Sequence, residues 1–168
     1  MTSVTVYTPE NLENNQISAN TKKTLSVFLA GTIDNGASVD WQSEVIEHLE
    51  TEPYGNIIVY NPRRKTWNPE AGHDEVMKQI DWEQRALEVS DFIVMNFLQD
   101  SKSPISFLEL GLFARSKKIA VFCPKKFYRY DNIEDTCHRY NVELINVNTS
   151  KNIAARIKRR AIDKATLG

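Results

Sequence analysis

The sequence predicts an α/β fold, built as a doubly wound parallel sheet of about five strands flanked by helices. Two observations carry this prediction. Short segments that are apolar at nearly every position alternate with longer segments whose apolar residues recur at helical spacing. Strands of that kind are typical of a parallel sheet covered on both faces, and their alternation with helices predicts right-handed crossovers. The expected arrangement is flavodoxin-like, with ligands bound beyond the carboxyl ends of the strands.

The N-terminal half supplies the first elements. Residues 1–24 form a polar segment rich in Asn and Thr, in which residues 4–7 have the composition of an edge strand. Residues 25–168 are predicted to form a single domain. This domain begins with an apolar strand at residues 25–30, continues with a helix at 38–49 and adds a strand at 56–60.

The C-terminal half repeats the alternation. Val76, Ile80 and Leu87 recur at helical intervals and predict a helix over residues 74–89. Residues 104–114 are apolar on every side of a predicted helix, so we expect that helix to be buried. The remaining predicted elements are strands at 91–97, 119–123 and 142–147, and a basic amphipathic helix at 152–165.

The composition excludes several functional classes. The chain has 168 residues, of which 41% are hydrophobic and 26% charged, and a net charge of -1, so nothing attracts it globally to nucleic acid or to an anionic membrane. It has neither a membrane-spanning apolar run nor the features of a signal peptide at its start. Two cysteines are too few for a disulfide framework, and no histidine belongs to a zinc motif. We therefore expect a cytoplasmic protein without metal, cofactor, nucleic-acid partner or membrane partner.

Gly31 follows the first predicted strand and opens a turn-like stretch that includes Asp34. A glycine at a strand end lets the backbone approach a ligand closely, and exposed amides in such a loop can hold a phosphate. A plain tight turn explains the same residues equally well, because no Gly-x-Gly-x-x-Gly fingerprint is present.

Asn61, Pro62, Arg63 and Arg64 follow the second predicted strand, with Trp67 close behind. Two arginines and an aromatic ring could bind an anion or stack a base. The alternative is a solvated loop with a packed Trp67, and the loop by itself favours that alternative.

The helix predicted after the third strand carries one isolated carboxyl. Ser103 is a suitable N-cap and Pro104 fits the first helical position. Glu109 is the only ionisable residue between Lys102 and Arg115. An acid early in a helix can simply complement the helix dipole, but a buried, unpaired carboxylate costs several kcal/mol and is better explained by function.

A second acid lies on the helix that precedes the third strand. Glu83 shares a helix face with Leu87, which runs toward that strand, and it is the better candidate for a second functional carboxyl. Asp81 and Arg85 on the same helix are expected to be merely solvated.

The ordered motifs of the chain resemble the nucleoside 2-deoxyribosyltransferase-like proteins, in particular their shorter bacterial and viral branch. The resemblance covers about residues 25–142. No single motif is decisive, but the ordered set is specific. The motifs are Phe28-Leu29-Ala30-Gly31-Thr32-Ile33, Asp40-Trp41-Gln42, Asn61-Pro62-Arg63-Arg64, Gln79-Ile80-Asp81-Trp82-Glu83 and Ser103-Pro104-Ile105-Ser106-Phe107-Leu108-Glu109-Leu110-Gly111-Leu112.

The resemblance assigns roles to matching positions. Glu109 matches the nucleophile that attacks the anomeric carbon, and Glu83 matches the acid that contacts the base, where relatives carry Asp. Phe28 stands where transferases usually have a Tyr that touches the nucleophile, and Asn132 matches an Asn supplied by a neighbouring subunit. The chain is thus expected to be a homo-oligomer with shared active sites. The expected substrate-binding residues are Phe28, Gly31, Asp34, Trp41, Asn61, Arg63, Ser103 and Asn132.

The expected function is cleavage of the N-glycosidic bond of a (deoxy)nucleoside or its 5′-monophosphate, with transfer of the (deoxy)ribosyl group to another base or to water. The alternatives are an NAD-glycohydrolase and a catalytically silent nucleotide-binding module, which Phe28 favours. Ser103 stands where transferases have an Asp that binds the 5′-hydroxyl and where related nucleotide hydrolases have a Ser near a 5′-phosphate. Because a Ser hydroxyl can donate to a phosphate and two arginines are expected nearby, we expect the 5′-monophosphate to be preferred.

Overall fold

The computed structural model describes residues 3–11, 23–52, 54–66 and 68–167. Trp67, one of the residues expected near the second strand, lies outside them. The strands of the described residues are β1 (Val4–Tyr7), β2 (Thr24–Gly31), β3 (Asn56–Tyr60), β4 (Phe92–Asn96), β5 (Ile119–Phe122) and β6 (Glu143–Ile145). The α-helices are α1 (Trp41–Thr51), α2 (His73–Val89), α3 (Pro104–Phe113), α4 (Tyr130–Tyr140) and α5 (Ser150–Leu167).

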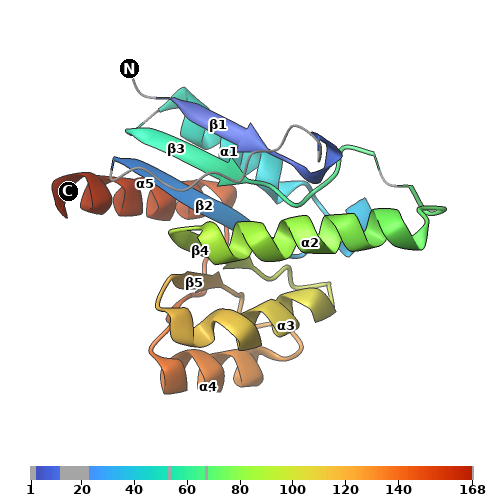
Figure 1. Ribbon diagram of the computed structural model, residues 1–168. Helices are drawn as coiled ribbons and strands as arrows, with labels where there is room; N and C mark the ends of the chain where they lie inside the picture. The colour runs from blue at the N-terminus through green and yellow to red at the C-terminus, as the bar shows by residue number, and fades with distance from the viewer. Residues whose placement is uncertain (1–2, 12–22, 53, 67, 168) are drawn as a thin grey trace.

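The described strands form one all-parallel, six-stranded sheet in the order β1-β3-β2-β4-β5-β6 (Figure 1). Without β1, this is the flavodoxin-like order in which the second strand lies outside the first and the remaining strands follow on the other side. The additional strand, β1, is the edge strand expected in the N-terminal segment. Its Val4 pairs with Ile57 of β3, and its Tyr7 pairs with Tyr60. The predicted fold class is confirmed.

Helices cover both faces of the sheet, which explains why its strands are apolar throughout. On one face, α1 and α5 bury residues such as Leu49 and Ile157 against alternate strand positions. The helices α2, α3 and α4 lie on the other face (Figure 1). They pack around an aromatic cluster that includes Phe28, Tyr60 and Trp82. All five residues of β4 are buried because this strand lies between β2 and β5, with helices above and below.

The expectation that the helix after the third strand is buried on all sides is wrong. Ser106, Glu109 and Leu110 of α3 are buried, but Leu108 is 55% exposed and Leu112 is 58% exposed. The helix belongs to the outer layer, and its far face meets no other element within the described residues. The apolar composition of α3 therefore reflects a surface that the described residues leave uncovered.

Helix α4 was not predicted. Its sequence is polar on most of its surface, and only three side chains, those of Tyr130, Ile133 and Cys137, are buried against the sheet. These positions are spaced at i, i+3 and i+7, so a narrow apolar stripe was present between charged residues. The helix ends at Asn141, which adopts the left-handed conformation of a helix terminus.

Gly31 ends β2 at the point where the strand order reverses. Its φ is +127°, and a Cβ at this position would collide with the backbone oxygen of Asn96 on β4. Close approach of β2 and β4 thus requires glycine, independently of any ligand. Ligands of doubly wound sheets bind in the crevice beyond the carboxyl ends of the strands, next to this position.

Candidate active site

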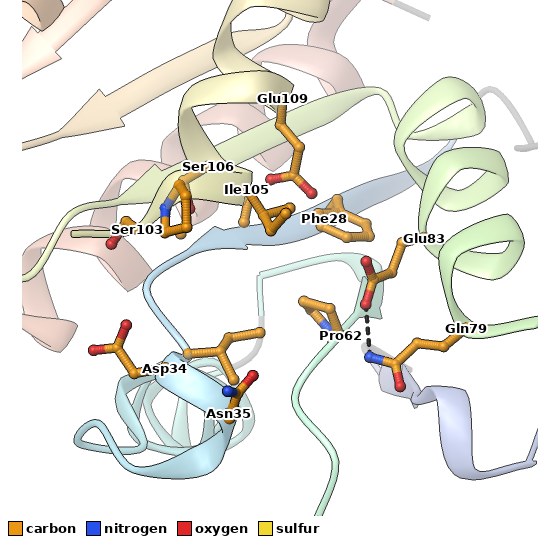
Figure 2. Close-up of a pocket in the computed structure, with 14 residues that line it drawn as sticks. Phe28, Asp34, Asn35, Pro62, Gln79, Glu83, Ser103, Ile105, Ser106 and Glu109 are labelled. Carbon is orange, nitrogen blue, oxygen red and sulfur yellow. Dashed lines mark hydrogen bonds between the residues drawn. The ribbon is translucent and has the colours of Figure 1, made fainter. Parts of the chain in front are cut away.

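A cavity of about 300 Å³ lies beyond the carboxyl end of β2, between α2 and α3 (Figure 2). The end of β2 forms its floor, Pro62 contributes from the segment after β3, and the loop after β2 closes one end. Its lining residues are Phe28, Ala30, Gly31, Ile33, Asp34, Asn35, Pro62, Gln79, Glu83, Ser103, Pro104, Ile105, Ser106 and Glu109. Six of the predicted site residues thus meet at one place, because the crevice at the reversal of strand order collects the ends of these elements. They are the two acids, Glu83 and Glu109, and four predicted substrate-binding residues, Phe28, Gly31, Asp34 and Ser103.

Glu109 lies one helical turn after Ile105 on α3, and its side chain faces the cavity (Figure 2). The residue is only 6% exposed. Removal from water disfavours the charged form, and the nearby carboxyl of Glu83 adds repulsion, so the pKa of Glu109 rises to about 8. These surroundings therefore favour the protonated form of this carboxyl.

Glu83 reaches the same cavity from α2, on the opposite side (Figure 2). Burial raises the pKa of its carboxyl, while a hydrogen bond from Gln79 and the charge of Arg64 oppose that rise. Gln79 Nε2 donates to Glu83 Oε1 at 2.9 Å, from one turn earlier on the helix. Two carboxyls with raised pKa that repel each other through one cavity form a coupled pair suited to acid–base chemistry.

The other end of the cavity is built from hydroxyl groups. Ser103 does not cap α3 with its side chain as expected, because its backbone is left-handed (φ 47°) instead of extended. Its Oγ lies 2.5 Å from Thr32 Oγ1 and 2.9 Å from Ser101 Oγ. Ser101 Oγ in turn donates to Asp34 Oδ1 at 2.7 Å. These four residues join the loop after β2 to the loop before α3.

Three non-glycine residues that line the cavity, Asp34, Asn35 and Ser103, adopt positive φ angles. Such conformations cost on the order of 1–3 kcal/mol each and persist where surrounding structure holds them. Their concentration at one end of the cavity shows that both loops are held in a defined shape there.

Arg63 holds one of these loops and does not line the cavity. Its guanidinium donates to Gly36 O at 3.0 Å, to Val39 O at 3.2 Å and to both oxygens of Ser38, and its Nε lies 3.6 Å from Asp40 Oδ1. All five of its N–H groups face the loop, so none remains for a ligand. Predicted to bind substrate, Arg63 instead positions the segment that carries Asp34.

Trp41 and Asn61 also lie outside the lining of the cavity. Trp41 Nε1 donates to Thr32 O at 2.9 Å, and Asn61 Oδ1 accepts from the backbone N–H of Arg63 at 3.0 Å. Both residues therefore support the loops around the site in the same way as Arg63. Asn61 was predicted to bind substrate because it follows a strand end, and Trp41 because it belongs to a motif of the resemblance. The sequence could not separate a ligand-binding role from a supporting one.

Arg64 and Asn132 lie elsewhere. Arg64 forms an ion pair with Glu75 of α2 at 2.7 Å, and Asn132 is exposed on α4. Neither lines the cavity. The 5′-phosphate expectation relied on Arg63 and Arg64 beside the site, and the structure places neither of them in its wall.

Sequence reasoning overlooked Gln79, Thr32 and Ser101. A signal for Gln79 was available, since it lies one helical turn before Glu83 and opens a matching motif. Thr32 and Ser101 had no such signal, because their contacts join segments about seventy residues apart along the chain, as the separation of 71 between Thr32 and Ser103 illustrates.

Metal-binding clusters and membrane-spanning helices are both absent from the described part of the chain. Within the described residues, no group of three or more His, Cys, Asp and Glu side chains is arranged to hold a metal ion. No described helix combines the length and the apolar character needed to cross a membrane.

Comparisons with known proteins agree with this architecture. A crystal structure described as a conserved protein from Enterococcus faecalis V583 superposes with a TM-score of 0.56 at 13% identity, over 82% of this chain and 99% of that chain, which shows a shared fold. No protein with a curated description matches. Residues 24–127, more than half of the chain, match the family model described as nucleoside 2-deoxyribosyltransferase like. The chain therefore belongs to the nucleoside 2-deoxyribosyltransferase-like family.

Proposed function

We propose that this protein cleaves the N-glycosidic bond of a (deoxy)nucleoside or its 5′-monophosphate, with Glu109 as nucleophile. The (deoxy)ribosyl group then passes to another base or to water. The observation that carries the proposal is the placement of Glu109, which is nearly buried in a cavity that it shares with a second carboxyl, Glu83. Two carboxyls in one cavity whose lining residues include no cation are unfavourable for stability, and chemistry explains their presence.

The reaction follows from these two groups. An oxygen of ionised Glu109 attacks the anomeric carbon as the bond to the base breaks, and the bonding electrons leave with the base. Protonated Glu83 supplies the proton that the departing base takes up. In the second step a new base or water attacks the same carbon, the ester to Glu109 breaks, and Glu83 recovers a proton from the attacking group.

The proposed roles require the negative charge of the pair to lie on Glu109 at the moment of attack, although the raised pKa of this carboxyl favours its protonated form. The reactive form needs one ionised and one protonated carboxyl, and repulsion between Glu83 and Glu109 favours a pair that carries a single negative charge. Glu83 keeps its hydrogen bond from Gln79, so its side chain is oriented whichever form it takes. Positive charge that develops on the sugar then favours ionisation of Glu109 in the transition state.

The second candidate is a catalytically silent nucleotide-binding module. Two observations favour it: the ring of Phe28 offers no hydrogen bond to Glu109, and the raised pKa of Glu109, about 8, favours its protonated form, which is not nucleophilic. An NAD-glycohydrolase remains the alternative among enzymes.

We also propose that the protein acts as a homo-oligomer, at least a dimer. Apolar side chains are exposed on both helices that flank the cavity: Val76, Met77 and Ile80 on α2, and Ile105, Leu108 and Leu112 on α3. Exposed apolar groups gathered beside a binding site are typical of an interface. Light scattering at micromolar concentration should show a dimer or larger assembly, and a monomer would contradict both the assembly and a role for Asn132 in a neighbouring site.

One assay separates the candidates. Purified protein is incubated with a panel of nucleosides, their 5′-monophosphates and NAD, with and without a second free base. Release of a base supports hydrolysis, exchange of bases supports transfer, and release of nicotinamide from NAD alone supports the glycohydrolase. Binding without any product, at every pH between 6 and 9, would leave the silent module and contradict our proposal.

A further inference from the structure

Every charged side chain in the wall of the cavity is acidic. These side chains are Asp34 at one end, Glu83 at the other and Glu109 between them, and no Lys or Arg is among the lining residues. Of the two arginines that follow Pro62, Arg63 donates its hydrogens to the loop after β2. Arg64 donates to Glu75, and its buried Nε has no hydrogen-bond partner among the described residues. A phosphate monoester carries about two negative charges at neutral pH, so this wall opposes one.

Asp34 lies at the end of the cavity where the sugar's 5′ carbon must point. Figure 2 shows Glu83 and Gln79 on one side of the cavity, and Asp34 on the other with Ser103. With the anomeric carbon at Glu109 and the base at Glu83, the rest of the sugar extends toward Ser103 and Asp34. This assignment of the two ends rests on the proposed function.

The hydrogen bonds at this end have a fixed direction. Ser101 donates its single hydroxyl hydrogen to Asp34 Oδ1, so in its contact with Ser103 the hydrogen must come from Ser103. The hydrogen between Ser103 and Thr32 must then come from Thr32, whose Oγ1 also accepts from the backbone N–H of Leu98 at 3.0 Å. The three hydroxyl groups therefore all donate in the direction of the Asp34 carboxylate.

This direction changes what Ser103 can offer a ligand. Its hydrogen is committed to Ser101, so it presents an acceptor lone pair to the cavity instead of a donor. A sugar hydroxyl can donate to an acceptor, whereas a phosphate, which has only acceptors when ionised, cannot. The N-terminus of α3 does favour an anion, but the protein already supplies one in Asp34, connected to it through Ser101 and Ser103.

We propose that Asp34, acting through Ser101 and Ser103, is the specificity determinant that selects a free 5′-hydroxyl and rejects a 5′-phosphate. The substrate class is thus the nucleoside and not the nucleotide, which reverses the expectation drawn from Ser103 alone. Arg63 and Trp41 act as positioning residues here, because they hold the loop in which Asp34 is presented.

Asp34→Asn tests the assignment cleanly. Asn tolerates the left-handed backbone that Asp34 adopts (φ 50°), and its side-chain oxygen can still accept from Ser101, so the variant removes the charge and keeps the shape. Asp100→Asn is the matched control, since Asp100 is exposed next to Ser101 and is not a lining residue. Circular dichroism checks that both variants fold.

Binding is measured by calorimetry with the four common 2′-deoxynucleosides and their 5′-monophosphates, in a Glu109→Gln background so that no turnover intervenes. The chain with Asp34 should bind its best nucleoside at least tenfold more tightly than the matching monophosphate. Asp34→Asn should shift that ratio at least tenfold toward the monophosphate, and Asp100→Asn should leave it unchanged. The assignment is overturned by equal or tighter binding of the monophosphate to the chain with Asp34, by equal shifts in the two variants, or by no binding of either compound.

Turnover by the wild-type protein separates this inference from the proposed function. If neither compound is cleaved but the binding ratio responds to Asp34→Asn, the proposed function fails and the role of Asp34 stands. If the monophosphate is cleaved with the higher kcat/KM, the proposed function stands and the role of Asp34 is refuted.

Discussion

The two faces of the sheet are packed for different purposes. The face under α1 and α5 is closed by aliphatic side chains such as Val45, Leu49 and Ile157, all fully buried. The face under α2, α3 and α4 carries the aromatic cluster, the cavity and both carboxyls with raised pKa. One face thus stabilises the fold, and the other keeps ionisable groups in surroundings that disfavour their charge.

Buried polar atoms as such do not distinguish the faces. Among the described residues, the side-chain amide of Gln42 on α1 is buried without a hydrogen-bond partner, and so are Tyr60 Oη and Trp82 Nε1 on the opposite face. The difference lies in titratable groups. Carboxyls shifted upward by burial are found beside α2 and α3, which is where a reaction that moves protons needs them. The comparison predicts that mutations on the two faces will affect different properties.

The largest expected effect comes from removing the carboxyl of Glu109. Glu109→Gln keeps size and shape, and we expect kcat to fall by about a thousandfold or more, because loss of a covalent nucleophile raises the barrier by several kcal/mol. Initial rates with the best nucleoside, measured beside Glu70→Gln as an exposed control, provide the check. More than a few per cent of residual activity would exclude Glu109 as the nucleophile.

On the opposite face, Leu49→Ala should reduce stability and leave the chemistry intact. Leu49 belongs to α1 and is fully buried in the core on this face of the sheet. Truncation of such a leucine costs about 2–5 kcal/mol of unfolding free energy. Leu167→Ala, at a residue that is 90% exposed, should change stability by about 0.5 kcal/mol or less. Urea unfolding measures both, and a kcat for Leu49→Ala far below the wild-type value under folded conditions would contradict the separation of the faces.

The site face should also show its character in the pH dependence of stability. The pKa of Glu109 is raised from 4.5 to about 8, so between these values the folded protein binds more protons than the unfolded chain. Unfolding free energy must then fall as pH rises through this window. Glu109→Gln removes that dependence. The unfolding free energy of this variant should therefore equal that of the wild type near pH 4 and exceed it by on the order of a few kcal/mol at pH 9.

Parallel urea titrations at several pH values test this. Glu70→Gln, at an exposed position, is expected to follow the wild type throughout. A constant difference between Glu109→Gln and the wild type at all pH values would mean that the carboxyl does not titrate in this window.

The sequence predicted the features that depend on local composition. The doubly wound fold class follows from apolar segments alternating with helices, and the burial of Glu109 from its isolation within an apolar helix. The exposed face of α3 was not predictable, because composition does not reveal how many layers cover a helix. The roles of Arg63 and Asp34 depend on which loop each side chain meets, and these contacts are set only when β2 and β3 lie side by side.

The smallest effect we predict concerns Phe28, whose ring lies between the carboxyls of Glu109 and Glu83 in Figure 2. Phe28→Tyr adds a hydroxyl to a ring in the cavity wall, and we expect this group to donate to ionised Glu109. A hydrogen bond to a charged group contributes about 1.5–3 kcal/mol, and one pKa unit corresponds to about 1.4 kcal/mol. We therefore expect the pKa of Glu109 to fall by about one unit from its value of about 8.

The sign of the change makes the test specific. The acidic limb of the kcat/KM profile reports ionisation of the nucleophile, so Phe28→Tyr should move this limb to lower pH and raise kcat/KM about tenfold near pH 6.5. Phe28→Leu is the control, because it loses the ring contact with Trp82 but gains no donor, and its limb should stay in place. If Phe28→Tyr raised the rate equally at every pH, the hydroxyl would be acting on substrate binding and not on Glu109. If the limb moved to higher pH, the new hydroxyl would desolvate Glu109 by more than its hydrogen bond stabilises the carboxylate. Desolvation would then dominate the pKa of Glu109, and a single added donor would not lower it.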